Sequence, residues 1–208
     1  MPPTVTKQKN VEPAPQARAQ RADARRNHRR VLDAARRCFA EDGLDAQIDD
    51  IARAAGLGVG TVYRHFPTKA ALVDALAADR FERLVEKAHE ALEHSDPWEG
   101  FCDFMRSSAE IQANDRALSE VMGSRPQMMD EAATAAGLYE PMAELVRRAQ
   151  RAGSMRRDAV PDDVPALICG LGRVASPGYS GPKIEWERML AIMLDGLRAP
   201  GGVKMPPS

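Results

Sequence analysis

Two short segments of helical periodicity, separated by a glycine, constrain this chain more than any other feature. Residues 48–55 place their apolar side chains on one face of a first short helix, which Gly56 ends. Residues 59–66 repeat this pattern and stop before Pro67. Two short helices joined by a tight, glycine-containing turn form a helix-turn-helix. The sequence therefore predicts such a unit over residues 48–66.

The glycines of this segment also permit another interpretation, a loop that holds a nucleotide. Gly56, Gly58 and Gly60 give the pattern G-x-G-x-G. A dinucleotide-binding loop, however, follows a strand and opens a long helix. Here the preceding segment has helical periodicity, and the next helix ends at Pro67 after roughly two turns. We therefore prefer the helix-turn-helix and keep a nucleotide-binding enzyme only as an alternative.

Helical spacing continues along most of the chain, and no segment alternates as a strand does. The predicted fold class is all-α, with a small three-helix unit followed by a larger bundle. Thr68 is a good N-cap for a long helix, and Pro141 should kink or split its own helix. Further helices are expected at 27–42, 68–92, 97–113, 115–123, 126–152, 161–175 and 183–198. The predicted boundaries are a disordered tail at 1–24, a helix-turn-helix unit at 25–70, a larger bundle at 71–198 and a flexible tail at 199–208, with a loop at 176–182.

Composition excludes several classes of protein. The cysteines Cys38, Cys102 and Cys169 are far apart and odd in number, which supports neither a zinc site nor a disulfide framework. His28, His89 and His94 have no partner at ligand spacing, so no metal or cofactor is predicted. Neither a signal peptide nor a membrane-spanning run is visible, and we expect a cytoplasmic location.

Charge is distributed unevenly along the chain. Residues 1–80 hold 14 Lys and Arg against 10 Asp and Glu, a net of +4, while the whole chain has a net charge of −1. Residues 1–30 alone hold 8 basic and 2 acidic side chains. Such asymmetry favours a polyanionic partner for the N-terminal end. The arginines of this end either follow a DNA backbone or are only solvated, and they are Arg18, Arg21, Arg25, Arg26, Arg29 and Arg30.

At this point the sequence resembles a known family. The stretch "VLDAARRCFAEDGLDAQIDDIARAAGLGVGTVYRHFPTKAALVDAL" is similar to the DNA-binding domain of TetR-like transcriptional regulators. The shared motifs are F-A-x-x-G, I-A-x-x-A-G and G-T-[VL]-Y-R-H-F-x-[ST]-K. One departure is that Gln47 and Gly58 stand where members often carry a Ser or Thr N-cap. Residues 149–172 resemble, more loosely, the junction into the dimerisation helices of the family.

The resemblance implies roles for the second short helix, which would lie in the major groove. The phosphate contacts implied are Thr61, Tyr63, His65 and Lys69, since hydroxyl, imidazole and ammonium groups suit phosphate oxygens. Tyr63 could instead be a core aromatic, His65 a structural hydrogen-bonding group and Lys69 a solvated side chain. Base recognition should fall to Val59, Gly60 and Arg64, because Val59 could meet a thymine methyl and Arg64 a guanine. Arg64 could also be a further phosphate contact.

The resemblance further implies a homodimer that binds a palindromic DNA operator and a small-molecule effector, most simply as a repressor that the effector releases. A DNA-binding protein that responds to no ligand is the second alternative. The implied effector pocket lies within residues 97–155, with Phe101, Phe104, Met105, Arg106, Met122, Arg125, Met128, Tyr139 and Met142 as candidate lining residues. The implied dimer interface comprises Leu167, Ile168, Leu171, Met189, Ile192, Met193 and Leu197. Methionines and these apolar faces could equally be the core of a monomer.

Overall fold

A computed structural model describes residues 15–115, 126–174, 181, 185–200 and 205. In these residues every regular element is helical, apart from an isolated antiparallel bridge between Met155 and Arg198. The predicted all-α fold class is therefore confirmed. The helices are α1 (Pro15–Asp42), α2 (Ile48–Ala55), α3 (Val59–His65), α4 (Lys69–Leu92), α5 (Pro97–Asn114), α7 (Pro126–Ala136), α8 (Tyr139–Arg151), α9 (Asp163–Val174) and α10 (Trp186–Leu197), with a 3-10 turn at Gly43–Asp45.

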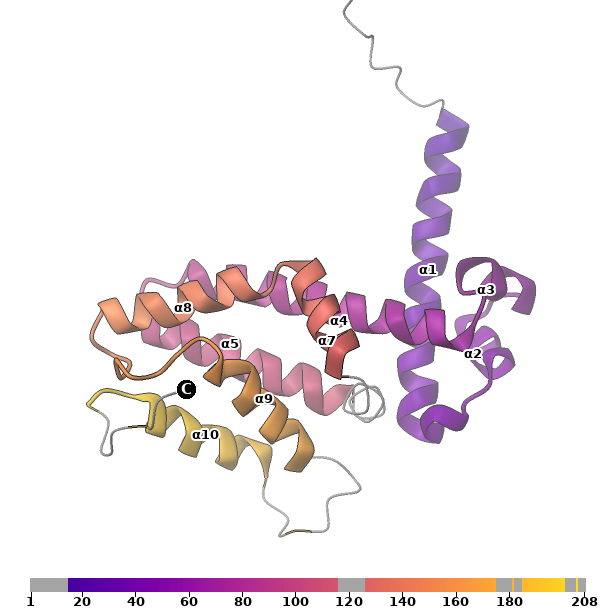
Figure 1. Cartoon of the computed structure of the whole chain (residues 1–208). Coiled ribbons are helices and arrows are strands. Elements are labelled where there is room, and N and C mark those ends of the chain that lie inside the picture. Colours follow the sequence, from indigo (N-terminus) through magenta and orange to yellow (C-terminus); the bar gives the residue numbers. More distant parts are fainter. Residues whose placement is uncertain (1–14, 116–125, 175–180, 182–184, 201–204, 206–208) are drawn as a thin grey trace, which may run out of the picture.

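The helices form two units that α4 joins (Figure 1). Helices α1, α2 and α3 pack together at one end of the molecule. Helix α4 starts beside them, passes α1 and continues into the bundle of α5 and α7–α10. Its N-cap is the predicted Thr68, whose Oγ1 accepts a hydrogen bond from the Ala71 N–H at 3.0 Å. Helix α5 runs back along α4, so its C-terminal end comes close to α1 (Figure 1).

The first helix is longer than predicted. We expected a disordered tail up to residue 24, but α1 begins at Pro15. Alanine, glutamine and arginine dominate residues 15–24, and all three have high helix propensity. Proline is also favourable at a first helical position. Low hydrophobicity indicated disorder, whereas local propensity extends the helix beyond the packed unit, where it projects from the molecule (Figure 1).

The helix predicted over 126–152 is split, but not at Pro141. Helix α7 ends before Gly137, which adopts a positive φ of 76°, and α8 begins at Tyr139. Pro141 lies in the first turn of α8, where a missing N–H breaks no intrahelical hydrogen bond. The left-handed glycine, rather than the proline, therefore sets the break.

Apolar side chains of both units form one continuous cluster of buried residues. Helix α5 contributes Phe101 and Phe104, the two largest fully buried side chains of the described residues, together with the fully buried Met105. Helices α5 and α9 approach closely at Gly172, which has no side chain. A Cβ added at Gly172 would lie 1.4 Å from Nε2 of Gln112 and would clash with it. The Oε1 of Gln112 accepts a hydrogen bond at 2.8 Å from Arg80. Burial of the Arg80 guanidinium lowers its pKa.

Several predictions concern residues outside the described ranges. They are the predictions for residues 1–14, most of the 115–123 helix, most of the loop at 176–182 and most of the tail at 199–208.

Candidate functional site

The turn between α2 and α3 has the geometry that the sequence predicted. Gly56 adopts the left-handed conformation with φ 62° and ψ 38°, which favours glycine. The Leu57 N–H donates to the Ala52 carbonyl at 3.0 Å, and the Leu57 side chain packs partly buried against the core. Helix α2, the turn and α3 therefore form a helix-turn-helix. The preceding element is a helix and not a strand, so the glycines do not form a dinucleotide-binding loop.

An arginine of α1 also stabilises this turn. The guanidinium of Arg30 donates to the Ala55 carbonyl at 2.7 Å and to the Gly56 carbonyl at 3.2 Å. These carbonyls belong to the unsatisfied C-terminal end of α2, where a cation is also favoured by the helix dipole. We had considered Arg30 only as part of a basic tail. Its contact is 25 residues away in sequence, and no local pattern indicates it.

Helix α3 depends on packing rather than on propensity. Its seven residues include a glycine and the β-branched Val59, Thr61 and Val62, and its N-cap Gly58 offers no side-chain hydrogen bond. Val62 is fully buried, and Phe66 just after the helix is nearly so. Full burial of one such side chain contributes about 1.5–3 kcal/mol, which exceeds the propensity cost of about 1 kcal/mol for one glycine. The buried face therefore holds the short helix in place.

The opposite face of α3 is exposed, and most of the predicted DNA contacts lie on it. Tyr63 is 46% exposed, so it is not a core aromatic. Val59, Gly60 and Arg64 are exposed as well, while Thr61 is half-buried. A Cβ added at Gly60 would meet no atom of the described chain within 4 Å. The helix thus presents a face that combines a hydroxyl, a guanidinium and an open glycine.

His65 lies at the border of this face, against an aromatic pair. Its ring centroid is 6.0 Å from that of His28 and 6.2 Å from that of Phe66, and the His28 ring is 4.9 Å from Phe66. Burial first, and the neighbouring His65 second, lower the pKa of His28. His65 is therefore packed on one side and half-buried, so structural and DNA-contacting roles are compatible.

Lys69 occupies the first position of α4, four residues after the end of α3. Its Nζ lies 5.7 Å from the centre of the Phe39 ring, a cation–π distance, and the side chain is half-buried. The adjacent N-terminus of α4 carries the positive end of a helix dipole. The ammonium and the helix end thus place positive potential on the same side as the end of α3.

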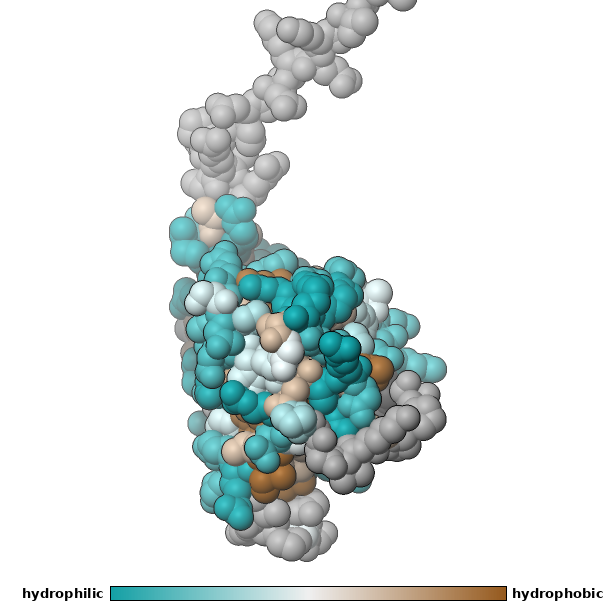
Figure 2. Space-filling model, turned by 90° about the vertical axis from the view of Figure 1, so that its left-hand side faces the viewer, coloured by the Kyte–Doolittle hydropathy of each residue, from teal (hydrophilic) through white to brown (hydrophobic). Residues whose placement is uncertain are grey.

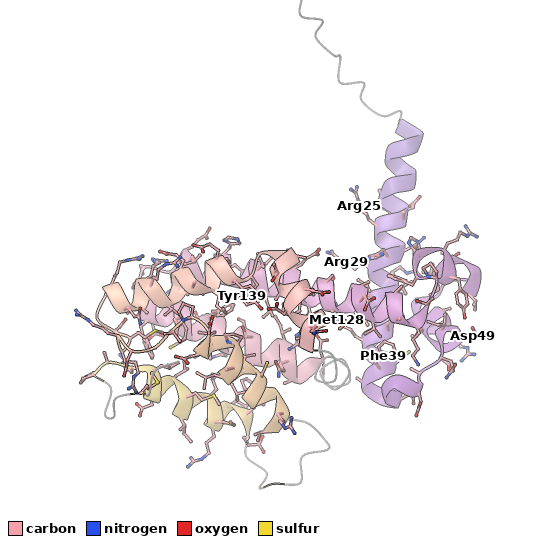
Figure 3. All side chains as sticks on the ribbon, in the orientation of Figure 1. Arg25, Arg29, Phe39, Asp49, Met128 and Tyr139 are labelled. Atoms are coloured by element: carbon pink, nitrogen blue, oxygen red, sulfur yellow. The ribbon has the colours of Figure 1, made fainter. Side chains whose placement is uncertain are left out.

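Arg25 lies on the part of α1 that projects beyond the unit, and Arg29 lies one turn further along the same helix (Figure 3). Arg25 and Arg29 are exposed, and Arg26 forms an ion pair with Asp23 on the same helix. Two acidic residues, Asp49 and Asp50, lie in the first turn of α2. Asp49 is exposed (Figure 3), and Asp50 pairs with Arg53 at 2.8 Å. Among the described residues, no three His, Cys, Asp or Glu side chains group as metal ligands do.

The candidate pocket residues divide by burial. Phe101, Phe104, Met105 and Met142 are buried in the bundle, and Met128 is partly buried against it. Arg106 is exposed and pairs with Asp103 at 2.5 Å, so it does not point into the bundle as we expected. The candidates Met122 and Arg125 lie outside the described residues.

Tyr139 also differs from the expectation for a pocket residue. It is exposed at the start of α8, and its hydroxyl donates to the Asp130 carboxylate at 2.5 Å. This hydrogen bond, followed by burial, raises the pKa of Tyr139 to about 12. The phenol therefore links α7 to α8 at the surface.

The candidate dimer residues fall into two groups. Leu171 is only 2% exposed and Leu197 is buried as well, so both belong to the core of a single chain. Ile192 is 61% exposed. The face in Figure 2 is mostly hydrophilic, but hydrophobic colour gathers at its lower edge, at the height of α10 in Figure 1. The remaining candidates are partly buried: Leu167 and Ile168 belong to α9, and Met189 and Met193 belong to α10.

A helix-turn-helix with one buried and one exposed polar face, joined to a larger helical bundle, is the arrangement of a DNA-binding transcriptional regulator. Residues 31–76 match the family model "Bacterial regulatory proteins, tetR family". Residues 96–199 match the model "Transcriptional regulator SbtR-like, C-terminal domain". The chain therefore belongs to the TetR family, as its sequence indicated. It is a transcriptional regulator and not an enzyme, so the nucleotide-binding alternative is set aside.

Known relatives agree with this assignment. The chain is 32% identical over 153 residues to the HTH-type transcriptional repressor Rv1474c of Mycobacterium tuberculosis, covering 70% of this chain and 76% of the relative. The TetR transcription regulatory protein of Mycobacterium vanbaalenii has a similar structure, with a TM-score of 0.66, 38% identity and coverage of 86% of this chain and 99% of that one. The TetR regulator SCO0520 of Streptomyces coelicolor gives a TM-score of 0.59 at 31% identity, over 82% and 98% of the two chains. None of the described helices is long and apolar enough to cross a membrane.

Proposed function

We propose that this regulator is a homodimeric repressor, which binds a palindromic operator through α3 and releases it when a small molecule enters the bundle. The observation that carries the proposal is the division of α3. On one face of α3, Val62 is fully buried. On the other face, Tyr63 and Arg64 are exposed in the described part of the chain. A helix of poor propensity with an exposed cationic face suits the DNA major groove.

The side chains of this face fit two kinds of DNA contact. Thr61, Tyr63 and His65 carry groups that hydrogen-bond phosphate oxygens, and Lys69 adds a charge beside a helix N-terminus. Arg64 is exposed near the middle of the same face, with Val59 and Gly60 one turn before it. An arginine can donate two hydrogen bonds to guanine O6 and N7, and a valine can contact a thymine methyl. We assign phosphate binding to the first group and base recognition to the second.

Dimerisation follows from the need for two recognition helices and from the apolar face of α10. One two-turn helix contacts only a few base pairs, so specific binding requires a second copy at a fixed spacing. The exposed Ile192 with Met189 and Met193 supplies an apolar surface for that copy, and Leu167 and Ile168 of α9 lie in the adjoining helix. Leu171 and Leu197 support the interface from the core.

An effector would bind within the bundle, near α5 and α8. Phe101, Phe104, Met105 and Met142 give this region an apolar lining, and methionine side chains adapt to varied ligand shapes. Arg106 and Tyr139 make surface contacts and are not part of the proposed lining. A regulator of transcription acts where the chromosome lies, and a cytoplasmic location is therefore part of the proposal.

Selection of bound duplexes from a random pool tests the proposal without knowledge of the operator or effector. The proposed function predicts recovery of a two-fold symmetric sequence whose half-sites lie about one helical turn, 34–36 Å, or a multiple of it apart. Recovery of no preferred sequence would instead support a sequence-independent architectural DNA-binding protein. A small-molecule screen against the selected duplex then separates ligand-responsive from ligand-independent binding.

A further inference from the structure

An ion-pair cluster connects the DNA-binding unit to the bundle. The Asp115 carboxylate follows α5 and is only 2% exposed. Its Oδ2 accepts a hydrogen bond from Arg83 at 2.7 Å, and its Oδ1 lies 3.6 Å from Nε of Arg36. Arg36 also donates a hydrogen bond to the Asp79 carboxylate, and Nε of Arg83 lies 3.3 Å from Oδ2 of Asp79. We call these four residues the Asp115 cluster.

The cluster joins three helices that lie far apart in sequence. Arg36 belongs to α1 of the DNA-binding unit, and Asp79 and Arg83 belong to α4. Asp115 directly follows the last residue of α5 in the bundle. Helix α5 runs back along α4 and ends beside α1 (Figure 1). The two arginines therefore span the junction, and a rotation of α1 relative to α5 would separate Arg36 from Asp115.

The physical chemistry of the cluster makes it sensitive to that rotation. A carboxylate at a helix C-terminus faces the negative end of the dipole and is unfavourable there without cations. Loss of one partner leaves a buried charge incompletely compensated, which costs far more than loss of a surface pair. The planar guanidinium of Arg83 donates to Asp115 in one of few favourable orientations, while Arg36 contacts Asp115 as an ion pair. Arg36 makes a third ion pair, with Asp33 at 3.0 Å, but that pair lies within α1 and does not depend on the angle between the two units.

We propose that Asp115 is a positioning residue for operator recognition: through Arg36 and Arg83 it fixes the orientation of the DNA-binding unit on the bundle, and so sets the half-site spacing that the dimer accepts. This inference rests on the proposed homodimer and palindrome. Each added base pair moves a half-site by about 3.4 Å and rotates it around the duplex. A unit held at one angle cannot follow that change, whereas a loosened unit can.

The test compares duplexes that differ only in spacing. Wild type, Asp115→Asn and Arg36→Gln are measured against the selected palindrome, against the palindrome with one central base pair added or removed, and against a single half-site. Asp33→Asn is the matched control, because it removes the acidic partner of Arg36 that lies on α1 itself and leaves the junction contacts in place. Circular dichroism and thermal melting establish that each variant is folded.

Wild type and the control should prefer the native spacing strongly. In both cluster variants the ratio of affinities for native and altered spacing should fall at least threefold, while half-site affinity stays within twofold of wild type. Arg36→Gln carries the test if Asp115→Asn does not fold, because the Arg36 side chain is 19% exposed and its loss leaves Asp115 paired with Arg83.

Two results overturn the inference: folded variants that keep the wild-type spacing ratio, or an equal loss on every duplex including the half-site. The second would mean that the cluster only stabilises the fold. Failure of the proposed function is visible separately, because wild type itself would then select no symmetric duplex or show no spacing preference.

Discussion

Helices α3 and α10 both carry large side chains that are exposed in the described part of the chain, yet their exposed faces differ in chemistry. On α3 the exposed Tyr63 adjoins Arg64, so aromatic surface and positive charge occur together. On α10, Ile192 is exposed, with Met189 one turn before it and Met193 directly after it in the helix. The first face suits nucleic acid, and the second suits another protein surface. The two faces lie on separate units (Figure 1), so each can be changed without the other.

The largest effect should come from a charge on the apolar face. Ile192→Asp should separate the dimer, because an isolated carboxylate would be buried against a second apolar face. Operator affinity should then fall by roughly 10²–10⁴-fold, since the two half-sites are no longer bound together. Sedimentation at micromolar concentration and binding assays measure both effects. Ala191→Asp is the control, because Ala191 is exposed on the polar side of the same helix, and a stable Ile192→Asp dimer would exclude this interface.

Leu171 separates the fold from the interface. Because its side chain is buried within one chain, Leu171→Ala should lower the free energy of unfolding by about 2–5 kcal/mol. Urea unfolding monitored by circular dichroism gives this value, and the remaining folded protein should still sediment as a dimer. A folded, fully stable monomer would instead place Leu171 at the dimer interface.

A methyl group at Gly60 should affect the fold and DNA binding in opposite directions. Within the described chain nothing lies within 4 Å of an added Cβ, so Gly60→Ala should stabilise α3 by about 0.5–1 kcal/mol through helix propensity. The same methyl should weaken operator binding if this face approaches the groove closely. Thermal melting and operator titration of one variant supply both values. Unchanged operator affinity in the stabilised protein would move Gly60 away from the DNA.

The smallest effect concerns Lys69. Lys69→Ala should weaken operator and random duplex alike, and it should reduce the slope of log affinity against log salt by about 0.9. Titrations at several salt concentrations measure the slope. Lys87→Ala is a control on the same helix, because Lys87 pairs with Glu90 far from α3. An unchanged slope for Lys69→Ala would show that this ammonium does not bind a phosphate.

The sequence was sufficient for the features that depend on local spacing. The turn at Gly56 and the N-cap Thr68 were both predicted and are confirmed, because each follows from residues within one or two helical turns. The all-α class followed from the same periodicity. The prediction of disorder up to residue 24 was wrong for residues 15–24, which form the start of α1. Their low hydrophobicity indicated disorder, whereas their high helix propensity favours the helix.

Features that depend on distant residues could not be predicted. Arg30 binds carbonyls of α2, and Asp115 binds arginines of α1 and α4, but no spacing in the sequence links these positions. Periodicity likewise shows that Leu171 and Ile192 are apolar without showing which of them is covered by the same chain. Assigning an apolar residue to core or interface needs the packing of the whole bundle.

The central claim, that the exposed face of α3 recognises base sequence, is tested most directly by Arg64. Wild type and Arg64→Ala are compared on the selected operator and on random duplex at one fixed salt concentration. The account predicts a loss of about 1–3 kcal/mol on the operator and a much smaller loss on random duplex, because a guanine contact exists only at the correct sequence. An equal loss on both duplexes would contradict it and make Arg64 a phosphate contact.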